Sequence, residues 1–357
     1  MHIERIVIEN LRNIAYADIS PYNKLNIIFG SNGAGKTTLL ESIYLLARAR
    51  SFRQIKAGSL IKEGNEKLNL YTTLRTENQS KHKIGLQKSA SGTIIKKDGE
   101  LLKKLSSLAK AIPLSIISPN IQRIIEEDPQ QRRRLLNWGL FHVEPNYGNL
   151  ANRYKKILLQ RNNALKDSYE QIKVWDQQLV KVGEEIDSTM FEYCKKWNQK
   201  INALVEKTQL IEPISIYLKK GWKEDESFYE ALERNGKIDR ERGFTSCGPH
   251  RADIRILQNG KQIRNRFSRG EAKITAVLLL LAQTKILSEF SDELPILLAD
   301  DLHAELDSDR YSTLINLIEE LKLQSFVTTL NFDHTTKDLI TDSYQLFHVE
   351  QGVISKI

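Results

Sequence analysis

The stretch from Gly30 to Thr38, GSNGAGKTT, constrains this chain more than any other part of its sequence. A glycine, four residues and then Gly-Lys-Thr is the pattern of a phosphate-binding P-loop. The glycines are needed because such a loop uses positive φ angles and brings its N–H groups close to phosphate oxygens. The apolar run 24–29 predicts a strand before the loop, and the periodicity of 36–50 predicts a helix after it. A strand, this loop and a helix in that order indicate nucleotide binding.

Within this loop the residue types suggest separate roles. We expect Lys36 to reach the β- and γ-phosphates of the nucleotide and Thr37 to hold Mg²⁺ by its hydroxyl. The backbone of the whole loop is predicted to bind the nucleotide. Its residues are Gly30, Ser31, Asn32, Gly33, Ala34, Gly35, Lys36, Thr37 and Thr38.

A second stretch supplies the acid that a P-loop needs. The apolar run 295–299 is typical of a strand buried on both faces of a parallel sheet, and it ends in Asp300 and Asp301. Asp300 fits the carboxylate that completes the Mg²⁺ site of P-loop ATPases, and Asp301 could polarise the attacking water. An acidic loop after a strand would be unremarkable alone, but together with the P-loop the metal interpretation is favoured.

The stretch 267–273, FSRGEAK, precedes an apolar helix. Ser268 is a favourable N-cap residue, and Glu271 three positions later completes a capping box. The N–H groups at the start of a helix can also bind a phosphate. A capped helix and an anion site are compatible interpretations of the same residues.

In order along the chain, these motifs resemble those of ABC-type ATPases of the SMC-like branch. The P-loop, an insertion, a Ser-x-Gly signature at 268–270, the acids at 300–301 and a D-loop at 304–307 follow one another. The stretches 8–14, 49–53, 248–253, 267–270 and 300–307 narrow the resemblance to the RecF family, over essentially the whole chain. The middle stretches 128–138 and 158–165 agree with it.

The resemblance implies an α/β fold, an ABC-type P-loop ATPase head with an inserted, mostly helical lobe. We expect the head to comprise residues 1–118 and 245–357, and the lobe residues 119–244. In this superfamily the signature serine contacts a γ-phosphate bound by the other subunit. Ser268 and Gly270 would therefore act in trans, Asp307 would lie across a homodimer interface, and Arg12 and Asn13 would approach the nucleotide.

The same resemblance implies a cytoplasmic protein of recombinational gap repair with ATP and Mg²⁺ as its cofactors. It would dimerise on ATP, bind double-stranded DNA near single-strand/double-strand junctions, and work with RecO and RecR to help load RecA. Asp301 stands where transporter ATPases carry the longer glutamate, so we expect slow hydrolysis by a DNA-stimulated switch. The switch histidine of transporters is missing from 326–330, where Thr328 or Thr329 could take its place.

The DNA-contacting surface is not specified by a motif. The net charge of +8 favours an anionic partner. Two basic clusters could contact phosphates or could be solvated faces. One is 132–134, and the other consists of Arg153, Lys155, Lys156 and Arg161.

Other functional classes remain to be weighed. The alternative to the gap-repair protein is another SMC-like DNA-associated or defence ATPase. A transporter subunit is disfavoured by the Asp300-Asp301 pair without a switch histidine. A nuclease or defence ATPase with a fused metal-dependent active site is disfavoured by the lack of a further acid or histidine cluster. The charges within the first residues disfavour a secretory signal, and the apolar run 276–282 is too short to cross a bilayer. The two cysteines show no metal-ligand spacing.

Overall fold

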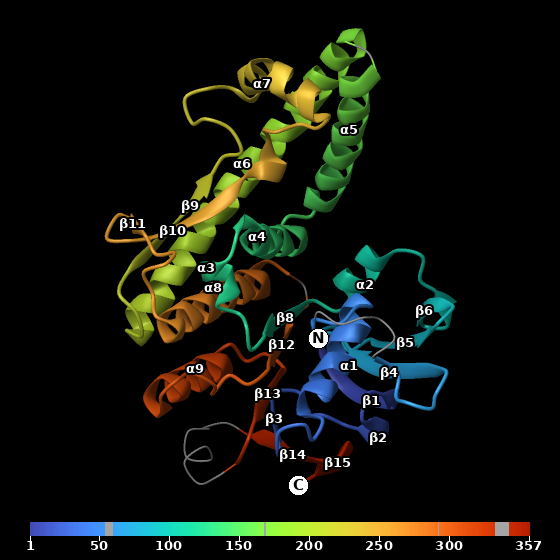
Figure 1. Ribbon diagram of the computed structural model, residues 1–357. Coiled ribbons are helices and arrows are strands. Elements are labelled where there is room, and N and C mark those ends of the chain that lie inside the picture. Colours follow the sequence, from blue (N-terminus) through green and yellow to red (C-terminus); the bar gives the residue numbers. More distant parts are fainter. Residues whose placement is uncertain (54–59, 168, 292, 333–342) are drawn as a thin grey trace. The chain divides into compact units, whose positions relative to one another are not determined.

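Two compact units make up the chain, residues 1–121 with 287–357 and residues 122–286. The computed structural model describes residues 1–53, 60–167, 169–291, 293–332 and 343–357 (Figure 1). This division places residues 245–286, which include Ser268, in the second unit, whereas the sequence analysis assigns them to the head. The predicted boundaries of the head and the lobe stay predictions.

One sheet of the first unit is antiparallel, with strand order β2-β1-β4-β5-β6-β7. Alternate residues of β4, among them Leu68, Leu70 and Leu74, are buried, as expected for a sheet with one covered face. The strands are β1 (His2–Leu11), β2 (Ile14–Ile19), β4 (Lys67–Arg75), β5 (Lys81–Ser89), β6 (Gly92–Lys97) and β7 (Glu100–Leu101).

The other sheet of this unit has the order β15-β14-β3-β13-β12-β8. Strands β14, β3, β13, β12 and β8 run parallel, and β15 is antiparallel to β14. Every residue of β12 and β13 is buried, which confirms the buried strand predicted at 295–299. The strands are β3 (Leu25–Phe29), β8 (Leu114–Ile117), β12 (Ile296–Ala299), β13 (Ser325–Thr329), β14 (Tyr344–Glu350) and β15 (Val353–Lys356).

Helix α1 (Lys36–Arg48) contacts strands of both sheets, namely β1, β4, β5 and β13. It is therefore buried on most sides, including Leu39, Ile43 and Leu46. The helix predicted after the glycine loop is confirmed, and it ends where Ala49 adopts a left-handed conformation with φ 55°. The remaining described helices of this unit are α2 (Leu105–Ala111) and α9 (Ser308–Glu320).

The second unit is mainly helical. Its helices α5 (Tyr147–Asp167) and α6 (Tyr169–Thr208) lie side by side, and α6 is 40 residues long (Figure 1). The predicted helical stripe of α6, which includes Leu179, Ile186 and Trp197, is buried. The other helices are α3 (Arg123–Glu126), α4 (Pro129–Val143), α7 (Phe228–Arg242), a short 3-10 helix (Pro249–Arg251) and most of α8 (Arg269–Phe290).

A small antiparallel sheet, β11-β10-β9, completes this unit. Its strands are β9 (Ile214–Lys219), β10 (Asp253–Gln258) and β11 (Lys261–Gln262), and β9 packs on α6. Helix α8 is buried continuously from Ala272 to Ala282, which accounts for the apolar run 276–282, and the buried stretch also includes Lys273 and Thr275. None of the described helices combines the length and the hydropathy needed to cross a membrane.

Candidate nucleotide-binding site

The candidate site lies at the carboxyl ends of neighbouring parallel strands, where open α/β sheets bind their ligands. Strand β3 leads into the glycine loop, and β12 ends before Asp300. Strand β13 lies between them, with Thr328 paired to Ile28 and Val327 paired to both Ile27 and Ala299. The sheet order therefore brings residues from three distant parts of the sequence to one edge.

The glycine loop has the backbone that its sequence predicts. Gly30, Gly33 and Gly35 have φ angles of 151°, 79° and 123°, a range that side chains disfavour. A Cβ on Gly30 would also lie 2.2 Å from the carbonyl oxygen of Val349. Ser31, Asn32 and Gly33 are exposed at the loop surface. The loop is thus fitted against β14 on one side and open on the other.

Lys36 is the first residue of α1. Its ammonium group donates to the carbonyl oxygens of Gly30 at 2.6 Å and Ser31 at 2.9 Å, so it lies across the loop. Burial lowers its pKa, and the carboxylates of Asp301 and Asp300 oppose that shift. A cation held over a loop of this kind can pair with the phosphates of a nucleotide.

Thr37 and Asp300 are brought together, although 263 positions separate them in sequence. The Thr37 hydroxyl donates to Asp300 Oδ1 at 2.9 Å. Asp300 is 3% exposed, and burial raises the pKa of its carboxyl against the hydrogen bonds from Thr37 and Thr328. A hydroxyl and a carboxylate are the hard oxygen donors that Mg²⁺ prefers, so these two residues fit that ion.

Thr328 connects the two acids. Its hydroxyl donates to Asp300 Oδ1 at 3.0 Å and accepts from the backbone N–H of Asp301 at 2.8 Å. Asp301 itself is exposed and has φ 53°, a left-handed conformation that aspartate tolerates better than most residues. Thr329, the other threonine considered in the sequence analysis, instead donates to the carbonyl of Asn331 at 3.1 Å.

Arg12 and Asn13 form the turn between β1 and β2 beside this loop. The guanidinium of Arg12 is paired with the carboxylate of Glu41, which is completely buried in α1 and also accepts from the hydroxyl of Ser51. Asn13 Nδ2 donates to the carbonyl oxygens of Gly33 at 3.3 Å and Ala34 at 2.9 Å. The Arg12 side chain therefore contacts α1, and the Asn13 side chain contacts the loop.

The predicted signature residues Ser268 and Gly270 belong to the second unit. The capping box is confirmed, because Glu271 N–H donates to Ser268 Oγ at 3.3 Å and Ser268 N–H donates to the Glu271 carboxylate at 2.8 Å. Ser268 is exposed at this helix tip. In the first unit, Asp307 is the N-cap of α9 and accepts from the N–H of Arg310 at 2.9 Å.

Comparison with known proteins shows which family this chain is similar to. The model of the RecF/RecN/SMC N terminal domain matches residues 2–355. The DNA replication and repair proteins RecF of Shewanella frigidimarina and Shewanella denitrificans are each 35% identical over 360 residues, covering 100% of both sequences. The chain belongs to the RecF family.

Solved structures agree with that assignment. The recombination mediator protein RecF in the RecFOR pathway, solved with ATP, has a TM-score of 0.87 and 26% identity, and the match covers 100% of this chain and 97% of that one. An Smc head domain with an extended coiled coil, bound to the C-terminal domain of ScpA from Pyrococcus furiosus, has a TM-score of 0.61 at 15% identity and shares the fold. The predicted α/β head with a helical insertion is therefore correct.

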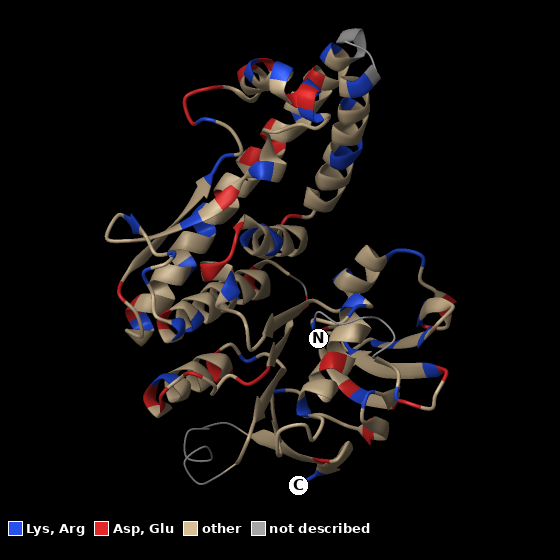
Figure 2. Ribbon diagram, in the orientation of Figure 1, with Lys and Arg blue, Asp and Glu red and all other residues tan. Residues whose placement is uncertain are grey.

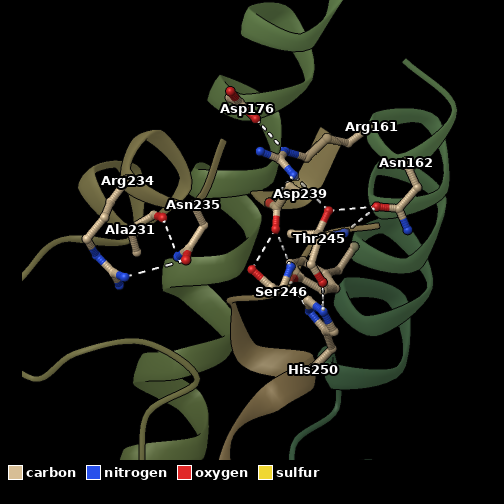
Figure 3. Close-up of polar contacts among 11 residues, drawn as sticks. Arg161, Asn162, Asp176, Ala231, Arg234, Asn235, Asp239, Thr245, Ser246 and His250 are labelled. Atoms are coloured by element: carbon tan, nitrogen blue, oxygen red, sulfur yellow. Dashed lines mark hydrogen bonds and ion pairs between the residues drawn. The ribbon is translucent and has the colours of Figure 1, made fainter. Parts of the chain in front are cut away.

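Two arginines of the expected DNA surface of this RecF-family chain are structural instead. Arg132 is 4% exposed and forms a bidentate pair with Asp253 at 3.0 Å. Arg161 is 1% exposed and donates to Asp176 at 2.5 Å, to Asp239 at 2.9 Å and to the hydroxyl of Thr245 (Figure 3). These side chains are neither available to phosphates nor solvated, so neither interpretation of the basic clusters holds at these two positions.

Of the other basic residues in those clusters, Arg133 is half-buried and donates to the carbonyl oxygen of Ala252 at 3.4 Å, and four lie on accessible surface. Arg134, Arg153, Lys155 and Lys156 are exposed. Along α5 and α6 the Lys and Arg residues are distributed over the helices, with Asp and Glu among those of α6 (Figure 2).

Gly352 was not among the predicted site residues, and the structure places it against the glycine loop. Its N–H donates to the carbonyl oxygen of Ala34 at 2.8 Å. The turn Gln351–Gly352 has φ angles of 47° and 83°, as in the tight turns favoured between antiparallel strands. A glycine between two short β-like runs was a visible signal for the turn, but nothing local indicated its neighbour.

Proposed function

We propose that this chain is an ATP-dependent DNA-binding protein of recombinational gap repair in the cytoplasm. ATP closes a homodimer on double-stranded DNA near a single-strand/double-strand junction, and hydrolysis opens it. With RecO and RecR the protein helps load RecA. The observation that carries this proposal is the Thr37–Asp300 hydrogen bond at 2.9 Å beside the glycine loop, which joins both halves of an ATPase site.

The roles at this site follow from the side chains. Lys36 pairs with the β- and γ-phosphates, and the N–H groups of the loop and of the start of α1 hold their oxygens. Thr37 and Asp300 are the protein ligands of Mg²⁺, which when bound neutralises charge on the phosphates. Few protein ligands suffice because the phosphates supply others, in agreement with the lack of any larger His, Cys, Asp or Glu cluster among the described residues.

A second subunit completes the site in this proposal. Ser268, exposed at the tip of α8, and Gly270, half-buried, bind the γ-phosphate of the ATP that the partner subunit holds, and the exposed Asp307 lies in the interface. The support is that the tip is capped by its own residues, so its geometry is fixed before any ligand arrives. The RecF structures described with ATP and with ATPrS support the choice of nucleotide.

Asp301 orients the attacking water, and the protein hydrolyses ATP slowly. The aspartate side chain is one methylene shorter than that of glutamate, and the left-handed backbone at this position favours the shorter side chain. A steady-state ATPase assay without DNA should show turnover far below the usual enzyme median of about 10 per second. Fast turnover of the purified protein without DNA would contradict the proposed switch.

Sedimentation velocity tests the dimer. We expect wild-type protein to be dimeric with ATP and monomeric with ADP, and Ser268→Arg to bind ATP while remaining monomeric. Ser227→Arg is the matched control, because Ser227 is an exposed serine with the same capping box at the start of α7 in the same unit. It should dimerise like the wild type. An ATP-dependent dimer of Ser268→Arg would refute the trans role.

A further inference from the structure

Two turns meet behind the glycine loop. They are the turn Arg12–Asn13 between β1 and β2 and the turn Gln351–Gly352 between β14 and β15. Both belong to the first unit. Their contacts are made through the carbonyl side of the loop, whereas phosphates are bound by N–H groups.

The carbonyl oxygen of Ala34 is the centre of this junction. It accepts from Asn13 Nδ2 at 2.9 Å and from the N–H of Gly352 at 2.8 Å. The carbonyl of Ala34 and the N–H of Gly35 share one trans peptide plane and point to opposite sides. Two donors that fix this carbonyl therefore also fix the direction of the Gly35 N–H.

Asn13 also contacts the middle of the loop and the first turn of the helix that follows it. Its Nδ2 also donates to the carbonyl of Gly33 at 3.3 Å, and its Oδ1 accepts from the hydroxyl of Thr38 at 3.2 Å. One carboxamide thus ties the loop to the first turn of α1.

The glycine at position 352 is required by this packing. A Cβ there would lie 2.2 Å from the backbone oxygen of Asn13. Backbone cannot move aside as a flexible side chain can, so a larger residue would push the turn away from Asn13 and the loop.

We infer that Asn13 and Gly352 form a clamp that positions the glycine loop for phosphate binding, so that Asn13 acts on the loop and not on the nucleotide. The inference rests on the proposed function and adds the residues that regulate the affinity of that site. Preorganisation raises affinity by removing the cost of ordering a loop on binding. The clamp holds the loop before the ligand arrives.

Nucleotide affinity measures the clamp directly. Asn13→Ala removes two hydrogen bonds to loop carbonyls, and the dissociation constants for fluorescent ATP and ADP analogues should each rise by about 10-fold. Gly352→Ala should weaken both by a similar factor. The double variant should bind only slightly more weakly than either single variant, because both changes release the same carbonyl. A merely structural role would lower the unfolding temperature without nucleotide and leave both constants unchanged.

Gly99→Ala is the matched control for backbone strain. Gly99 lies in the hairpin turn between β6 and β7 of the same unit with φ 91°, and a Cβ there would meet no atom within 4 Å. It should bind both nucleotides as the wild type does. If Asn13→Ala does not fold, Asn13→Ser, whose side chain is too short to reach both carbonyls, should show the same loss.

Each result has a separate meaning. Wild-type affinity in the Asn13 and Gly352 variants, or an equal loss in Gly99→Ala, overturns the clamp. Failure of the wild-type protein to bind either nucleotide overturns the proposed function instead.

Discussion

Substitution of Thr328 by valine tests whether one buried hydroxyl aligns the two acids of the site. Thr328 is 1% exposed, donates to Asp300 Oδ1 at 3.0 Å and accepts from the N–H of Asp301 at 2.8 Å. Valine has nearly the same shape, so the change creates no cavity and removes only the hydrogen bonds.

The expected cost follows from those two bonds. A hydrogen bond to a charged group contributes about 1.5–3 kcal/mol, and a buried N–H left without a partner costs about 1–3 kcal/mol. The two ranges add to about 2.5–6 kcal/mol, and because the Asp301 N–H is only part-buried we expect a loss near the lower end, about 3 kcal/mol in the free energy of unfolding. Loss of the Thr328 bond also raises the pKa of Asp300 further, since burial already raises it and this bond opposes the shift. Magnesium-dependent ATP binding should therefore weaken most at acidic pH.

Urea unfolding followed by circular dichroism measures the first effect, and ATP turnover as a function of Mg²⁺ concentration and pH measures the second. Thr328→Ser is the matched control because it keeps the hydroxyl and loses only a methyl group. We expect turnover to fall at least 10-fold in the valine variant, corresponding to about 1.4 kcal/mol. Equal stability and turnover in the two variants would refute the assigned role of this hydroxyl.

Three further predictions concern the second unit, and urea unfolding measures each. Arg161→Met leaves the fully buried Asp239 without its cation and should destabilise the chain by about 3–5 kcal/mol; unchanged stability would contradict the role of the pair. Burial lowers the pKa of His250 from 6.5 to about 4. As the pH falls below 6.5, the unfolded chain therefore binds a proton at this residue before the folded chain does. The free energy of unfolding consequently decreases from pH 7 to pH 5. Over that interval the free energy of unfolding of His250→Gln should fall by about 2 kcal/mol less than that of the wild type. Identical pH profiles of the two proteins would rule the effect out. Gly183→Ala places a Cβ 2.4 Å from the buried ring of Phe228 and should cost about 1–3 kcal/mol, whereas Gly236→Ala, with no atom within 4 Å, should be neutral or stabilising.

Much of the site could be predicted because its signals are local. The glycine loop, its flanking strand and helix, and the capping box at Ser268 each depend on residues within a few positions of one another. The pairing of Thr37 with Asp300 could also be expected, since carboxyl ends of parallel strands share one edge of a sheet. Where Ser268 lies relative to the nucleotide in a dimer depends on a second copy and stays a prediction.

Burial of the two arginines depended on partners far away in the sequence. Asp253 lies 121 positions from Arg132, and Asp239 lies 78 positions from Arg161. A partial signal was present, because Arg161 is four positions after the buried Ile157 and four before the buried Leu165, on the inner face of its helix. Periodicity could have distinguished this arginine from its exposed neighbours, but composition could not.

The position of β3 has a consequence for how the protein is made on the ribosome. Its neighbours in the sheet are β13 and β14, which are translated roughly three hundred residues later. Residues 122–286 form a unit that is continuous in sequence, and they emerge before those partners. A nascent chain therefore contains the glycine loop at an early stage, before the strands that support it have been made. It can bind nucleotide only after the β14–β15 hairpin has been translated.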